Sequence, residues 1–170
     1  MDIALPGREQ IEKVFGIFEL AAETCSILPR SQTQPHIFIG HGRHPAWRDL
    51  KDHLHEKHGF AVDAYETGAR AGYSIKEFLE ECQGDTDFAL LVHTAEDEDS
   101  LGELHARENV VHETGLFQGR LGLRRAIVLR EDGCKEFSNL AGVQEIRFSK
   151  ANIRETFGEV LATIKRECGV

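Results

Sequence analysis

The chain has 170 residues, of which 41% are hydrophobic and 29% charged, and its formal net charge is −9. A chain of this length buries roughly 70% of the surface that it exposes when unfolded, so it can form a core without a metal or a disulfide. The acidic balance excludes a duplex-DNA binder, whose affinity comes from cations that neutralise phosphates.

The apolar runs are far shorter than the roughly 20 residues of a membrane span, so no membrane partner is expected. The four cysteines lie far apart with no CxxC pair, which is typical of free thiols in a reducing compartment. The first residues lack the basic start and apolar stretch of a secretory signal. We therefore expect a cytoplasmic protein.

The first 35 residues are predicted to form a segment of their own. Apolar residues recur at helical spacing in Arg8–Thr24, which predicts an amphipathic helix. A polar run bracketed by Pro29 and Pro35 follows, and such a run is typical of a linker. We expect residues 1–35 to be an N-terminal helix and linker, and residues 36–170 to form the main domain.

From His36 on, predicted strands alternate with predicted helices. Short apolar runs typical of strands are His36–Ile39, Phe60–Tyr65, Phe88–His93, Ala126–Leu129 and Gln144–Phe148. Helical patterns lie between and after them, at Pro45–His58, Ile75–Cys82, about Leu104 to Leu121, and Ala151–Glu167. The alternation predicts an α/β fold, a parallel sheet with helices on both faces. In such sheets ligands bind beyond the carboxyl ends of the strands, which singles out the loops Gly40–Pro45, Thr67–Ser74 and Thr94–Glu103.

A glycine turn joins the first predicted strand of this domain to the helix that follows it. Its residues His41, Gly42 and Arg43 are candidate ligand-binding residues, because glycine lets a ligand approach the backbone and free N–H groups before a helix favour a phosphate. The alternative is a plain tight turn. Neither GxGxxG nor GxxxxGK[ST] occurs, so the dinucleotide-dehydrogenase and P-loop NTPase interpretations lose their main support.

Glu113 lies at the edge of the apolar stripe of the helix predicted to end at Leu121. A carboxylate there is partly buried, and burial costs free energy unless the group is paired or works in a site. From the residues alone, a structural salt bridge to an arginine is the more common of these two situations. Asn109 lies one turn earlier on the same side and could hydrogen-bond the carboxylate or a substrate hydroxyl.

No pattern of metal ligands or of a serine nucleophile appears. The histidines at positions 53, 55 and 58 lack ligand spacing and are predicted to face solvent. GxSxG is absent, which removes the usual serine hydrolase. The acidic stretch Glu96–Asp99 is predicted to be a solvated loop, although a divalent ion there is conceivable. We assign no metal.

The segment Arg107–Gly122 reads RENVVHETGLFQGRLG. With Ile37–Gly42, Phe88–Val92 and Phe137–Gly142, it resembles the bacterial TIR-like domains, a branch of the Toll/interleukin-1 receptor fold described as predicted nucleotide-binding proteins. The segment is close to that family's signature R-x-N-V-V-x-E-x-G-x-F-x-G-x-L-G. The similarity extends from about His36 to Glu167.

The resemblance implies a flavodoxin-like TIR fold with a five-stranded sheet of order 2-1-3-4-5. In enzymatic relatives it implies hydrolysis of NAD+ to nicotinamide and ADP-ribose, and the family's catalytic glutamate falls on Glu113. Such domains are commonly effectors of prokaryotic antiphage defence, self-associate, and are often fused to a sensor of cyclic oligonucleotides. A sensor domain or protein of that kind is therefore an expected partner.

The same resemblance suggests how a substrate would be held. The glycine turn would cradle the phosphates, and Trp47 or Tyr73 could stack on a base. Gly72, in the loop that also holds Tyr73, is a further candidate substrate-binding residue. The run Ala71–Ile75 departs from the Gly-Arg-Thr-Ile type run of relatives. NAD+ is the substrate and no cofactor is expected. A nucleotide-binding or signalling module without turnover, and a cyclase that releases cyclic ADP-ribose, remain as alternatives.

Overall fold

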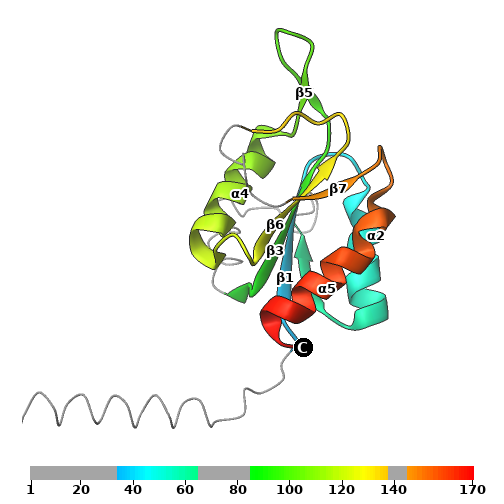
Figure 1. Ribbon diagram of the computed structural model, residues 1–170, viewed down its shortest axis with the longest axis vertical. Helices are drawn as coiled ribbons and strands as arrows, with labels where there is room; N and C mark the ends of the chain where they lie inside the picture. The colour runs from blue at the N-terminus through cyan, green and yellow to red at the C-terminus, as the bar shows by residue number, and fades with distance from the viewer. Residues whose placement is uncertain (1–33, 65–84, 138–144) are drawn as a thin grey trace, which may run out of the picture. The chain divides into compact units, whose positions relative to one another are not determined.

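The computed structural model describes residues 34–64, 85–137 and 145–170 (Figure 1). The predicted helices Arg8–Thr24 and Ile75–Cys82 and the candidate residues Gly72 and Tyr73 lie outside these ranges. Residues 34–170 form one compact unit. The division at residue 35 stays a prediction.

The centre of this unit is a parallel sheet. Its strands are β1 (His36–His41), β2 (Ala61–Ala64), β3 (Phe88–His93), β6 (Ala126–Glu131) and β7 (Ile146–Phe148). They lie in the order β2-β1-β3-β6-β7, and every neighbouring pair is parallel. If only the five strands of this sheet are numbered in chain order, the order is 2-1-3-4-5. The predicted α/β fold and strand order are therefore confirmed. All six residues of β3 are buried, as expected of a strand covered on both faces.

Helices cover both faces of the sheet (Figure 1). On one face lie α2 (Trp47–Asp52) and α5 (Phe157–Cys168), and on the other face lies α4 (Glu108–Leu121). Helix α2 continues as a π-helical turn (His53–Lys57). Helix α5 follows a 3₁₀ turn (Ile153–Thr156). Successive strand residues alternate between these faces, so Ile37 and Ile39 pack toward α2 and α5 while Phe38 stacks on Phe117 of α4. None of the helices in the described part of the chain has the length and apolar character that a membrane crossing requires.

The helix expected from about Leu104 begins later, so that boundary was wrong. Leu104–His105 forms β5, which pairs antiparallel with β4 (Asp97–Glu98) in a small hairpin. The Leu104 carbonyl also accepts the backbone N–H of Lys135 at 2.7 Å. These hydrogen bonds to other segments hold the backbone in a strand, and α4 begins only at Glu108, after Arg107 with φ −58° and ψ 139°.

Candidate functional site

The strand order reverses between β1 and β3, because the chain runs from β1 to β2 on one side and returns to β3 on the other. Ligands of open parallel sheets bind at such a reversal, beyond the carboxyl ends of the strands. Here the glycine turn follows β1, the segment Thr94–Glu96 follows β3, and α4 packs over both strands. The candidate site is therefore built from these three pieces of chain.

Glu113 is buried at this edge, with 7% of its surface exposed. A Cβ added at Gly40 would lie 2.5 Å from its Oε2 atom, so the missing side chain of Gly40 is what lets the carboxyl group lie against β1. Within the described residues, the Oε2 atom has no hydrogen-bond partner, and no arginine or lysine pairs with Glu113. The salt bridge considered from the sequence is thus not found in these parts of the chain.

Burial raises the pKa of Glu113 to about 8. The carboxyl group is therefore mostly protonated at pH 7. A positive charge brought next to it would lower its pKa again, because the carboxylate form gains Coulomb energy in a dry environment. The site is chemically suited to a ligand that carries or develops positive charge beside Glu113.

The backbone donors of the glycine turn bind a carboxylate of the protein itself. The N–H groups of Arg43 and His44 donate to Glu96 at 2.8 and 3.2 Å, and the Thr94 hydroxyl donates to it at 2.5 Å. A Cβ at Gly42 would overlap with the Glu96 carboxylate. Burial raises the pKa of Glu96, but these hydrogen bonds outweigh it and the net pKa is lowered. The expectation of a solvated acidic loop is therefore wrong for Glu96.

The aromatic candidates of the turn contact each other. The His41 ring stacks on Trp47 with ring centres 3.8 Å apart, and His41 Nδ1 lies 2.7 Å from the Gly42 carbonyl oxygen. Trp47 belongs to the core and is 3% exposed, so it could stack on a base only after a rearrangement. Asn109 is exposed on α4, and within the described residues no hydrogen bond joins it to Glu113. The structure thus brings Glu113 against Gly40 at the start of the turn, while Asn109 is exposed to solvent.

A buried polar pair, which the sequence analysis did not find, lies next to Glu113. The hydroxyl of Thr114 donates to the Val110 carbonyl at 2.7 Å and lies 2.9 Å from His93 Nε2. Since the hydroxyl hydrogen already bonds the Val110 carbonyl, His93 must donate through Nε2. Its buried Nδ1 then has no partner in residues 34–64, 85–137 and 145–170. Burial lowers the pKa of His93 to about 4, so the ring is neutral. The pair fixes α4 against the end of β3.

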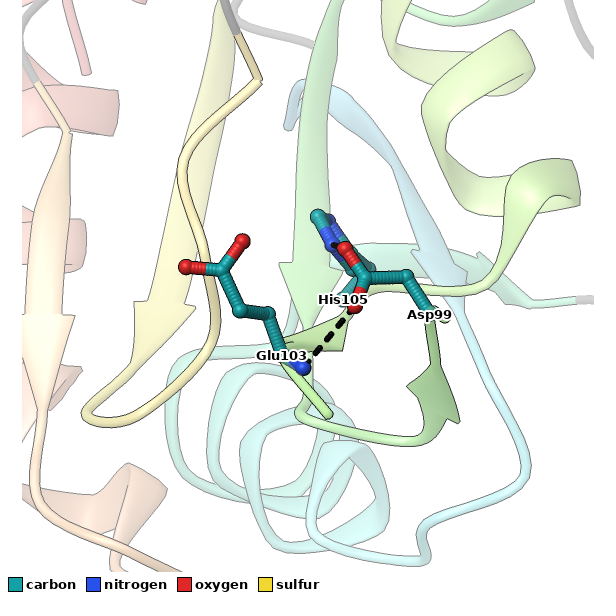
Figure 2. Close-up of side chains that lie close together, drawn as sticks. All are labelled: Asp99, Glu103 and His105. Carbon is teal, nitrogen blue, oxygen red and sulfur yellow. Dashed lines mark hydrogen bonds and ion pairs between the residues drawn. The ribbon is translucent and has the colours of Figure 1, made fainter. Parts of the chain in front are cut away.

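One further cluster of polar side chains lies in the β4–β5 hairpin. Ligand-type atoms of Asp99, Glu103 and His105 lie within 4.8 Å of one another (Figure 2). Asp99 accepts hydrogen bonds from the backbone N–H groups of Leu101 and Glu103. Its Oδ2 atom lies 3.0 Å from His105 Nε2. The side chain of Glu103 pairs with Lys135. Because cationic and N–H groups of the protein already compensate these carboxylates, the cluster braces the hairpin and carries no metal assignment.

Comparison of the sequence with known families identifies the family of this chain. A family described as "CAP12/Pycsar effector protein, TIR domain" matches residues 36–150. The chain belongs to this family. The matched range contains Glu113, the glycine turn and all five strands of the sheet, so the chain is a bacterial TIR domain of the antiphage-effector type.

Curated relatives match over shorter stretches. CD-NTase-associated protein 12 of Lachnospiraceae bacterium (strain RUG226) is 37% identical over 65 residues, which are 36% of this chain and 21% of that protein. CD-NTase-associated protein 12 of Flavobacterium daejeonense is 40% identical over 67 residues, 38% of this chain and 22% of that protein. Pycsar effector protein BcPycTIR of Burkholderia cepacia is 40% identical over 65 residues, 35% of this chain and 22% of that protein. The matches thus span less than a quarter of each of these relatives.

Proposed function

We propose that this TIR domain is an NAD+ glycohydrolase, which cleaves the nicotinamide–ribose bond to release nicotinamide and ADP-ribose. The observation that carries the proposal is the buried Glu113 carboxyl at the β1–β3 reversal, whose Oε2 has no hydrogen-bond partner among the described residues. Such a group is poised to interact with a ligand rather than with the fold.

The chemistry of the reaction suits one buried carboxylate. The C1′–N bond breaks with its electron pair going to nicotinamide, which leaves neutral and needs no general acid. Positive charge develops on the ribose as an oxocarbenium ion, and Glu113 in its ionised form would stabilise it. Water then adds to C1′ and loses a proton. The nicotinamide ring of NAD+ is cationic, so its arrival beside Glu113 would itself favour the ionised carboxylate.

The biological setting is part of the same proposal. The names of the relatives connect them with CD-NTases and with Pycsar effectors. By analogy, we propose that a nucleotide signal, sensed by another domain or protein, activates this chain together with self-association in antiphage defence. The chain would act in the cytoplasm, where NAD+ is available.

The test is nicotinamide release by the purified chain and by Glu113→Gln, with product analysis by chromatography. Removal of one preorganised electrostatic group costs about 10²–10³ in rate, so Glu113→Gln should lose at least that factor. Glu108→Gln, an exposed carboxylate in the first turn of the same helix, is the matched control and should keep its activity. Full activity in a folded Glu113→Gln variant would refute the assignment, and cyclic ADP-ribose as the product would identify the cyclase alternative.

A further inference from the structure

We propose that the glycine turn and Thr94 form a binding site for a phosphate group, and that the side chain of Glu96 is the built-in occupant that such a ligand must displace. The inference concerns access to the turn and holds whichever reaction the chain catalyses. The ligand class is a phosphorylated compound such as a nucleoside diphosphate.

Three donors from two separate elements converge on one carboxylate. The N–H groups of Arg43 and His44 come from the turn after β1, and the hydroxyl of Thr94 comes from the end of β3. Convergent backbone N–H groups of this kind form an anion-binding concavity. Gly42 completes it, since a side chain at that position would overlap with the bound carboxylate.

A phosphate bound at the turn would make more favourable contacts than the Glu96 carboxylate makes. The Arg43 side chain is exposed next to the turn, and within the described residues no carboxylate pairs with it. Arginine binds phosphate oxygens through two parallel hydrogen bonds. A phosphate group also offers more oxygen atoms and more negative charge than one carboxylate, so it can replace Glu96 on the same donors.

The exchange requires a rotation of one side chain and no movement of the loop. The backbone around Glu96 is held independently, because its N–H donates to the His105 carbonyl at 3.0 Å and the Ala95 N–H donates to Glu131 at 3.0 Å. Glu96 is partly exposed, so its carboxylate has a path to solvent. Glu96 therefore competes with anions for the same donors and lowers the affinity of the turn for them.

The experiment is a titration of the full chain with inorganic pyrophosphate, followed through the backbone amide NMR signals of Arg43 and His44. Three proteins are compared: the natural chain, Glu96→Ala, and the control Glu98→Ala. Glu98 is exposed on the neighbouring strand β4. The control therefore makes the same change in net charge, while the Glu96 carboxylate keeps its hydrogen bonds to the turn. Glu96→Ala should bind pyrophosphate at least about tenfold more tightly than the control, and the signals of Arg43 and His44 should shift; tenfold corresponds to about 1.4 kcal/mol.

Equal affinities of Glu96→Ala and Glu98→Ala would overturn the proposal and leave Glu96 as a brace of the turn. Shifts that bypass Arg43 and His44 would overturn it as well. If Glu96→Ala does not fold, Glu96→Gln replaces it, because glutamine keeps the size and removes the charge. Glu96→Gln should tighten binding in the same direction by a smaller factor, and unchanged affinity would refute the proposal. The titration needs no turnover, so its outcome is independent of the NAD+ assay.

Discussion

Glu113 holds a proton in the folded chain at pH values where it loses that proton in the unfolded chain. Its pKa is raised from 4.5 to about 8, so its contribution to stability is fully present below pH 4.5 and is lost as the pH rises toward 8. A glutamine cannot ionise and avoids this loss. Glu113→Gln should therefore match the natural chain in free energy of unfolding at pH 4 and exceed it by a few kcal/mol, in order of magnitude, at pH 8.

Urea denaturation at both pH values measures this difference. Glu108→Gln serves as control because Glu108 is exposed, and its effect should stay below about 1 kcal/mol at either pH. A Glu113→Gln variant that is less stable than the natural chain at pH 8 would mean that the carboxyl group is ionised and paired in the folded protein.

The same pKa predicts the pH profile of the proposed reaction. The ionised form of Glu113 is the active one, so kcat/KM should rise with pH through a midpoint near 8, which reports the free protein. The profile of kcat should have a lower midpoint, because the cationic substrate lowers the pKa of Glu113 in the complex. Steady-state rates of nicotinamide release between pH 6 and 9 measure both, and two profiles that are flat over this range would contradict the role of Glu113.

At the scale of elements, contact between β1 and α4 depends on one missing side chain. A Cβ at Gly40 would lie 2.5 Å from Glu113 Oε2 and 2.7 Å from Leu91 Cδ1, so Gly40→Ala forces the two elements apart. It should cost about 1–3 kcal/mol of stability and reduce nicotinamide release. The matched control is Gly115→Ala on the exposed side of α4, where a Cβ meets no atom of the described residues within 4 Å. This substitution should stabilise the helix by about 0.5–1 kcal/mol. Thermal and urea denaturation of both variants measure the contrast, and equal stability of the two would show that β1 and α4 adjust freely.

The elements also show what the sequence could and could not predict. Strand and helix patterns reflect burial on two faces, so the parallel α/β fold and the position of Glu113 on a packed helix followed from them. The strand order followed from the TIR resemblance instead. The hairpin Asp97–His105 did not, because its strands are held by hydrogen bonds to each other and to Lys135. Glu96 looked like one acid among several, since its N–H donors Arg43 and His44 lie more than 50 positions earlier in the chain.

For the whole molecule, we expect specific activity to rise with protein concentration. In the part of the chain that the structure describes, the Oε2 atom of Glu113 has no hydrogen-bond partner, and the TIR resemblance implies self-association. A neighbouring copy could then complete the site. The measurement is nicotinamide release per molecule across a wide dilution series, with the association state followed by light scattering. Constant specific activity across that series would mean that one chain suffices.

Deletion of residues 1–33 should leave a folded domain. Residues 34–170 form one compact unit, and both hydrophobic clusters of that unit are built from its own strands and helices. The shortened chain should be recovered folded and melt within a few degrees of the parent, as measured by circular dichroism. A large loss of melting temperature would show that the N-terminal segment contributes to the core.

The stacked pair His41–Trp47 makes the intrinsic fluorescence of the protein sensitive to the state of the turn. The chain contains a single tryptophan, and that indole lies face to face with the imidazole of the turn that follows β1. Indole emission responds to the distance and protonation of a stacked imidazole, so any ligand that rearranges the turn will change the fluorescence of Trp47. Stopped-flow mixing would then time ligand binding at the turn without a label.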